Sequence, residues 1–126
     1  MSFRTDMAKA RGLGSAKDGT HHWVSQRLTA IALIPLTLAF LYPFATSLGS
    51  GYEAVRETYQ NPIHALVAIL TFLVMFRHLR LGIQIVVEDY VHGPRLRAGL
   101  LITNALIWRG FAVIGIFAVA KIAFGA

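Results

Sequence analysis

Three stretches of the sequence are each long and apolar enough to cross a lipid bilayer as a helix. They run from about Leu28 to Leu48, from His64 to Val87 and from Ala98 to Phe124. The hydrocarbon layer is about 30 Å thick, and about 20 helical residues cross it. Lipid offers no water to the backbone polar groups, so a single segment satisfies them by forming a helix. The sequence therefore predicts an all-α protein with three transmembrane helices, which form one membrane domain over residues 1–126.

The composition agrees with a lipid environment. Hydrophobic residues make up 56 % of the chain and charged residues 14 %, against about 45–50 % and about 25 % in soluble domains. A soluble domain of 126 residues has too much surface to bury so large an apolar fraction. The net charge is +6, but the basic residues flank the apolar runs instead of gathering on one face. Membrane lipid is therefore the expected partner, and nucleic acid is not.

The residue types also limit the chemistry that this chain can perform alone. It contains no cysteine, which excludes thiolate catalysis and cysteine-bound iron–sulfur clusters within the chain. No apolar core directly follows the basic residues near the N-terminus, so we expect the first span, and not a signal peptide, to direct insertion. Three spans are few for a transporter, and no internal repeat is visible. We expect so small a bundle to pack against partner subunits or a cofactor.

Lysine and arginine side chains set the expected orientation. They precede the first and third spans, at Arg4, Lys9, Arg11, Lys17, Arg27, Arg95 and Arg97. The connection between the first two spans, residues 49–62, has only Arg56. The positive-inside rule then places the N-terminal segment, residues 1–27, in the cytoplasm. With three spans, the C-terminus is expected on the outer face.

The second span carries charged and polar side chains that need an explanation. An arginine or aspartate at the centre of a membrane helix costs about 2.5–3.5 kcal/mol on insertion scales, yet Arg77, His78 and Arg80 fall within four residues. At about 100° per residue, small and polar residues share one helix face with His78, whereas Arg80 points to the far side. Those residues are His64, Thr71, Gly82 and Asp89. This face of the second span is therefore a candidate functional site.

Three roles for His78 stay open from the residues alone. A histidine inside a span is commonly a hydrogen-bonded packing residue, and it can also relay protons. A neutral imidazole is equally a good axial ligand for haem iron. Gly82, one turn away, leaves space for a flat group to approach the backbone, and arginines nearer the aqueous end pair well with carboxylates such as haem propionates.

The residues that follow His78 resemble a known family. The pattern H-x-x-x-G-x-Q-x-x-x-E-D-Y-V-H runs from His78 to His92 and is similar to the D-type hydrophobic anchor subunit of succinate dehydrogenase (complex II). It looks most like alphaproteobacterial or mitochondrial members. The segment THHWVSQRLTAIALIPL, residues 20–36, resembles the first helix of that family, in which a histidine precedes an arginine by six positions.

The resemblance implies a haem b site shared between two chains. His78 corresponds to one axial ligand of the haem iron, and the other ligand comes from a companion C-type cytochrome b anchor subunit. Arg27 corresponds to an arginine near the haem propionates and the quinone pocket. His21 corresponds to the histidine six positions before that arginine, and the adjacent His22 is a rival for the same role.

The resemblance also implies part of a ubiquinone site. Tyr90 corresponds to a tyrosine whose hydroxyl hydrogen-bonds a quinone carbonyl, and Asp89 to its neighbour at the mouth of the site. Quinone reduction adds two protons with two electrons, so positioned donors are needed. From the residues alone, an interfacial belt tyrosine is the more common role for Tyr90, and Asp89 is equally a loop carboxylate. Arg80, Arg109 and His92 receive no assignment.

The function implied by the resemblance is that of a subunit without catalysis of its own. The chain would tether the flavoprotein and iron–sulfur subunits to the inner membrane of a bacterium or mitochondrion. Electrons from succinate would pass to ubiquinone, linking the tricarboxylic acid cycle to the respiratory chain. Two alternatives remain: the anchor of a fumarate reductase, and a structural or assembly membrane protein without a cofactor.

Overall fold

The described part of the chain is helical. A computed structural model describes residues 5–7 and 19–125, and no strand occurs among them. The helices are α2 (Gly19–Ser47), α3 (Tyr52–Gln60), α4 (Pro62–Tyr90) and α5 (Pro94–Ala123). The all-α prediction is confirmed. Four basic residues used for the orientation lie outside the described residues: Arg4, Lys9, Arg11 and Lys17.

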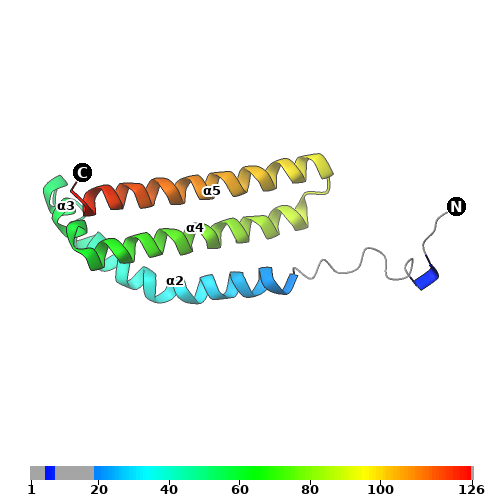
Figure 1. Cartoon of the computed structure of the whole chain (residues 1–126), viewed down its shortest axis with the longest axis horizontal. Coiled ribbons are helices and arrows are strands. Elements are labelled where there is room, and N and C mark those ends of the chain that lie inside the picture. Colours follow the sequence, from blue (N-terminus) through cyan, green and yellow to red (C-terminus); the bar gives the residue numbers. More distant parts are fainter. Residues whose placement is uncertain (1–4, 8–18, 126) are drawn as a thin grey trace.

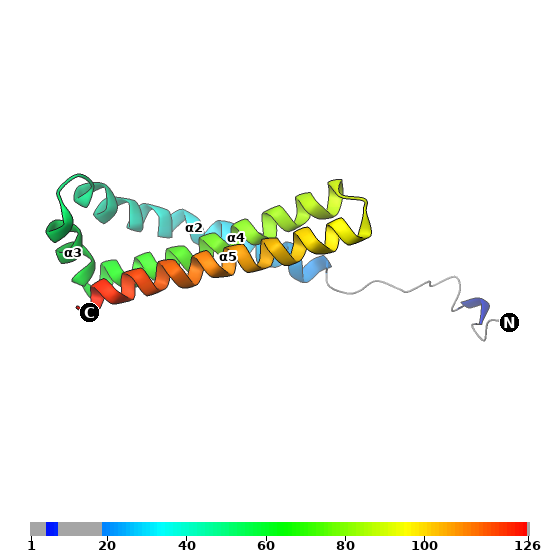
Figure 2. The same cartoon turned by 90° about the horizontal axis from the view of Figure 1, so that it is seen from above.

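Helix α4 lies between the other two long helices. It packs against both α2 and α5, whereas those two do not contact each other within the described part of the chain (Figure 1). The short helix α3 contacts all three long helices at one end of the bundle, close to the C-terminus (Figure 2). The helix that carries His78 is therefore the central one, with a neighbour on each side.

The three long helices are the predicted membrane spans. They contain 29, 29 and 30 residues, about 43–45 Å at 1.5 Å per residue, and each is apolar enough to cross a bilayer. Helix α2 begins at Gly19, well before the predicted start at Leu28. A hydropathy window finds only the apolar part of a helix, whereas the backbone hydrogen bonds continue through the polar turns beside the membrane. Pro35 and Pro43 lie inside α2 without ending it.

Local residues explain where the helices begin and end. Gly49 and Gly51 have φ values of 80° and 88°, a left-handed backbone that side chains disfavour, and they turn the chain from α2 into α3. Asn61 caps α4, because its side-chain oxygen accepts a hydrogen bond from the Ile63 amide at 2.9 Å. Pro94 begins α5, where its missing amide hydrogen costs no helical bond.

The core is thin and lies near α3. Tyr59, Ala65, Ala68 and Val119 form its buried cluster. Burial raises the pKa of the Tyr59 phenol and keeps it neutral. Beyond the cluster, α4 and α5 approach so closely that a Cβ added to Gly115 would lie 2.9 Å from the Phe72 ring.

Most large apolar side chains point outward. Leu38, Ile114 and Phe117 are 68 %, 65 % and 69 % exposed, and they represent many others along the three long helices. An apolar surface of this extent is not stable in water. The bundle therefore faces lipid or other membrane helices on most of its surface.

Candidate functional site

The middle of the polar face predicted for α4 packs on α2, whereas His64 contacts α3 and Asp89 is exposed. His78 Nδ1 lies 3.0 Å from Thr29 Oγ1, and Thr71 Oγ1 lies 3.5 Å from the Leu36 carbonyl oxygen. Small and polar side chains let membrane helices approach closely and hydrogen-bond each other. The shared face of His78 and Thr71 is therefore, first of all, a helix–helix contact.

The contact with Thr29 determines where the His78 proton resides. Thr29 Oγ1 also lies 2.9 Å from the Ser25 carbonyl oxygen and 3.0 Å from that of Gln26. A hydroxyl has one proton, and these carbonyls accept it. With that proton on a carbonyl, the Thr29 oxygen accepts a hydrogen bond from His78, and in this arrangement the imidazole proton is on Nδ1. The Nε2 atom keeps its lone pair, which is the state of a histidine that binds a metal.

Polar atoms without partners lie beside this contact. Gln26 reaches over Gly82, where an added Cβ would be 3.5 Å from its side-chain nitrogen. The Gln26 Oε1 atom and the His22 Nε2 atom are buried and have no hydrogen-bond partner within the described part of the chain. Buried polar atoms are normally paired. The start of α2 therefore offers unused hydrogen-bonding capacity close to His78, which fits a polar group supplied from outside this chain.

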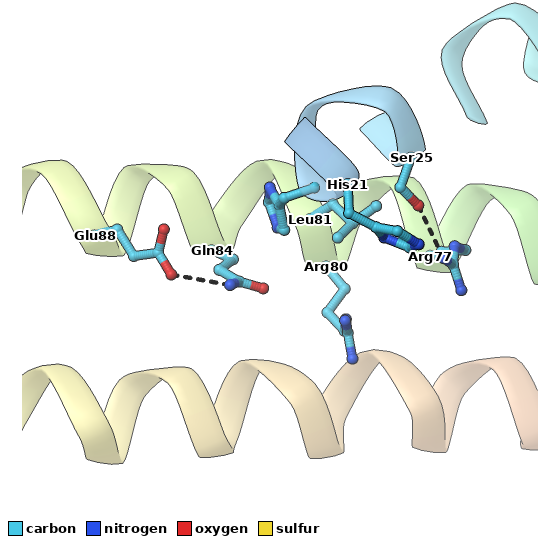
Figure 3. A pocket seen from close by; sticks show the side chains of 8 residues that line it. His21, Ser25, Arg77, Arg80, Leu81, Gln84 and Glu88 are labelled. Carbon is cyan, nitrogen blue, oxygen red and sulfur yellow. Dashed lines mark hydrogen bonds between the residues drawn. The ribbon is translucent and has the colours of Figure 1, made fainter. Parts of the chain in front are cut away.

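A polar cavity of about 450 Å³ lies between the start of α2 and the second half of α4 (Figure 3). Arg77 Nη2 donates to Ser25 Oγ at 2.8 Å on one side, and Gln84 Nε2 donates to Glu88 Oε1 at 2.9 Å on the other. The lining residues are His21, His22, Ser25, Arg77, Arg80, Leu81, Gln84 and Glu88. The lining contains two guanidinium groups and one carboxylate, that of Glu88, so the side of the cavity near Arg77 suits an anionic group.

His21 and Arg27 line different cavities. His21 lines the polar cavity, whereas Arg27 lines a neighbouring one of about 390 Å³ that also includes His22 and Glu88. The guanidinium of Arg27 lies 5.4 Å from the centre of the Trp23 ring, a cation–π contact. The two residues are on adjoining sides of the first turns of α2, and His22 stands between their cavities.

Asp89 and Tyr90 lie apart from His78. They occupy the last turn of α4, and Tyr90 is 78 % exposed. Tyr90 is about 18 Å along the helix from His78 at 1.5 Å per residue. Neither side chain has a hydrogen bond within the described residues. His92 is exposed in the connection to α5. The predicted haem residues and the predicted quinone residues therefore form two separate groups. The quinone group, Asp89 and Tyr90, is exposed at the end of α4.

Several contacting residues were missed by sequence reasoning. Thr29 follows Arg27 by two positions, and nothing in the sequence indicates that its hydroxyl meets His78 on another helix. The same holds for the bond between Ser25 and Arg77. Only the contact between Gln84 and Glu88 could be predicted from the sequence, because residues four apart on one helix are neighbours.

The site has one histidine suited to a shared metal. Within the described residues no three metal-binding side chains cluster. A haem iron held between two chains requires one axial histidine from each. His78 is half-buried and hydrogen-bonded through Nδ1, which meets that requirement.

The fold and the site define a class: a multi-pass membrane protein of three spans with a polar site at one end. The family model described as succinate dehydrogenase/fumarate reductase transmembrane subunit matches residues 1–119. The chain belongs to this family. It is a member of the group of succinate dehydrogenase membrane anchor subunits.

Relatives with the same description cover most of the chain. The succinate dehydrogenase hydrophobic membrane anchor subunit of Rickettsia bellii is 36 % identical over 104 residues, 82 % of this chain and 83 % of the relative. That of Paracoccus denitrificans is 32 % identical over 127 residues, 100 % of this chain and 97 % of the relative. The succinate dehydrogenase membrane anchor subunit of Reclinomonas americana is 32 % identical over 84 residues, 64 % of this chain and 70 % of the relative. No solved structure gives a significant match.

Proposed function

We propose that this chain is the D-type anchor of a succinate:ubiquinone oxidoreductase that holds haem b. It pairs with a companion C-type anchor in the membrane and tethers the flavoprotein and iron–sulfur subunits. It holds no cysteine-bound iron–sulfur cluster itself, because its sequence has no cysteine. Its task is to place a haem and a quinone where electrons from those subunits can reach them.

The observation that carries the proposal is the contact between His78 and Thr29. If His78 Nδ1 donates to Thr29 across the 3.0 Å contact, the imidazole proton is on Nδ1 and the Nε2 lone pair is free for the iron. Metal-binding histidines characteristically donate their other ring hydrogen to a neighbouring acceptor, which fixes the ring and its tautomer. A haem bound there would supply one-electron redox chemistry between the last iron–sulfur cluster and quinone.

The first turns of α2 would bind the haem propionates. Haem carries two carboxylates, and His21 and Arg27 line two adjoining cavities that share His22. The Arg27 guanidinium pairs well with a carboxylate. The unpartnered Nε2 of His22 is a second contact for such a group.

Tyr90 and Asp89 would serve the ubiquinone. Both are exposed at the end of α4, where the iron–sulfur subunit and the companion anchor would complete the pocket. The Tyr90 hydroxyl donates a hydrogen bond to a quinone carbonyl, which orients the ring and polarises it for reduction. The Asp89 carboxylate passes protons from the aqueous side. We place this end in the cytoplasm, together with the N-terminal segment 1–27, because Arg95 and Arg97 follow it directly.

Replacing His78 tests the proposal. The whole complex carrying His78→Ala, purified in mild detergent, is expected to lose or alter its b-type absorption spectrum and to contain less haem per complex. His64→Ala is the matched control, because His64 is on the same helix and is bonded to the Thr58 carbonyl oxygen at the opposite end. An unchanged spectrum and haem content in His78→Ala would refute the assignment.

A further inference from the structure

Three arginines border one cleft between α4 and α5. Arg77 and Arg80 extend from α4 and Arg109 from α5, and Phe76 and Trp108 are also in its wall. The cleft has a volume of about 330 Å³. Neither the haem site nor the quinone site proposed above uses Arg109. A cluster of like charges on membrane helices calls for a partner of opposite charge.

The cluster lies deep in the membrane. Arg109 is about 22 Å from the first residue of α5 and about 21 Å from its last, at 1.5 Å per residue. Arg80 is about 15 Å from the end of α4 on the same scale. A long side chain reaches the headgroups only from near a helix end. A counter-charge for Arg109 would therefore have to lie inside the hydrocarbon layer.

The described long helices have no carboxylate of their own at this depth. Helices α2 and α5 contain no Asp or Glu, and those of α4 are Glu88 and Asp89 in its last turn. Within residues 5–7 and 19–125, the one ion pair joins Arg56 and Glu53 on α3. The three guanidinium groups of the cleft repel one another, and this repulsion is strong where water is scarce.

The backbone and the aromatic wall of the cleft are held in place. The Asn104 amide donates to the Arg80 backbone carbonyl at 2.9 Å and ties the two helices together. The Phe76 ring stacks on Trp108 and Phe111, with centroids 5.9 and 6.0 Å apart. These contacts fix the backbone and the cleft wall without neutralising any of the three guanidinium groups. The cleft is thus preformed and open to an anion from outside the chain.

We infer that this cleft receives an Asp or Glu side chain from a transmembrane helix of the companion membrane chain. A carboxylate matches the planar guanidinium of Arg109 in shape and charge. Lipid phosphates do not fit, because they remain in the headgroup layer while Arg109 is near mid-bilayer. A second copy of this chain does not fit either, because it too lacks a carboxylate at this depth. The inference rests on the proposed pairing with a companion anchor, but it requires neither the haem nor the quinone site.

Cross-linking tests which molecule occupies the cleft. The chain has no native cysteine, so Ala112→Cys puts its one thiol in the cleft and leaves Arg109 intact. Ile114→Cys is the control, since Ile114 is 65 % exposed and about 160° around α5 from Ala112. Membranes containing the full complex are treated with a maleimide–benzophenone reagent and illuminated. Cross-linked peptides are then identified by mass spectrometry.

We expect Ala112→Cys to link to a companion-chain peptide within one helical turn of an Asp or Glu, and Ile114→Cys not to. Links to lipid alone, or to a segment without a carboxylate, would overturn the inference. In a second arm, Arg109→Gln is expected to lower the companion chain retained in detergent at least about tenfold, because a lone buried carboxylate is costly. The Arg109→Lys variant should retain most of the companion chain. Retention by Arg109→Gln at the wild-type level would also overturn the inference.

The two proposals fail in different ways. A wild-type complex without haem would contradict the haem assignment and leave the cross-linking result unaffected. Conversely, normal haem in a complex whose cleft cross-links only to lipid would contradict the inference drawn from Arg109 alone.

Discussion

The Nδ1 atom of His78 on α4 lies 3.0 Å from the Thr29 hydroxyl on α2. Thr29 is 8 % exposed, and its own proton goes to a backbone carbonyl of the preceding turn. The same contact therefore packs two membrane helices and sets the tautomer of an imidazole. Packing and ligation, which appear as competing roles for His78 in the sequence, are compatible because they use different ring nitrogens.

Removing the Thr29 hydroxyl should weaken haem binding without removing the iron ligand. Valine has nearly the shape of threonine but accepts no hydrogen bond, so Thr29→Val frees the His78 ring to change tautomer or rotate. Loss of such a supporting bond typically costs about 10- to 100-fold in metal affinity. The measurement is the rate of haem transfer from the purified complex to an excess of apomyoglobin, together with the midpoint potential of the haem.

Thr29→Ser is the matched control, because serine keeps the hydroxyl and should behave as wild type. A nitrogen-15 spectrum of the histidines gives a second readout that does not depend on electron transfer. Without haem, wild type should show the Nδ1-protonated tautomer at His78, and Thr29→Val a mixture. Equal haem transfer rates in Thr29→Val and wild type would show that the bond has no role in ligation.

Tyr90→Phe should impair quinone reduction selectively. The variant removes the phenol hydroxyl that orients the quinone carbonyl and leaves the ring. We expect quinone reductase activity to fall about 10²- to 10³-fold, the usual cost of removing one positioned hydrogen-bond donor. Succinate oxidation with an artificial acceptor, which bypasses the membrane site, should be unchanged.

Tyr52→Phe is the control for this experiment. Tyr52 has nearly the same exposure, 71 % against 78 %, but lies at the opposite end of the bundle, at the start of α3. The Tyr52→Phe variant should keep both quinone reductase activity and succinate oxidation with the artificial acceptor. If Tyr90→Phe lowered both activities together, the residue would act in assembly and not at the quinone.

The expected orientation leads to a third prediction. A reporter that is active only in the cytoplasm, fused after the C-terminus, should be inactive, and one fused before residue 1 should be active. Arginines at positions 95 and 97, at the start of α5, support the cytoplasmic side for that end of the bundle. A strongly active C-terminal fusion would reverse the orientation and move Tyr90 to the outer face.

The three spans were predictable because the hydrocarbon layer demands about 20 apolar residues from any helix that crosses it. Helix α3 was not predicted, because its nine residues are polar on one face and fall below any span criterion. The polar face around His78 was also correctly placed, since helical periodicity fixes which residues of α4 lie together. What periodicity cannot give is the neighbour opposite that face. Thr29 and Gln26 belong to α2, and only tertiary packing brings them to His78 and Gly82.

The close approach of α4 and α5 leads to the last prediction. A Cβ at Gly115 would lie 2.9 Å from the Phe72 ring, and that ring is held between Phe40 and Phe76. Gly115→Ala should therefore destabilise the bundle by about 1–3 kcal/mol, as overpacking does. Gly99→Ala is the control, because nothing lies within 4 Å of its added Cβ, and both variants gain the same helix propensity. The measurement is the midpoint temperature at which the purified complex loses its companion chain. The midpoint should fall for Gly115→Ala and hold or rise for Gly99→Ala, and equal midpoints would mean that the two helices separate to admit a methyl group without cost.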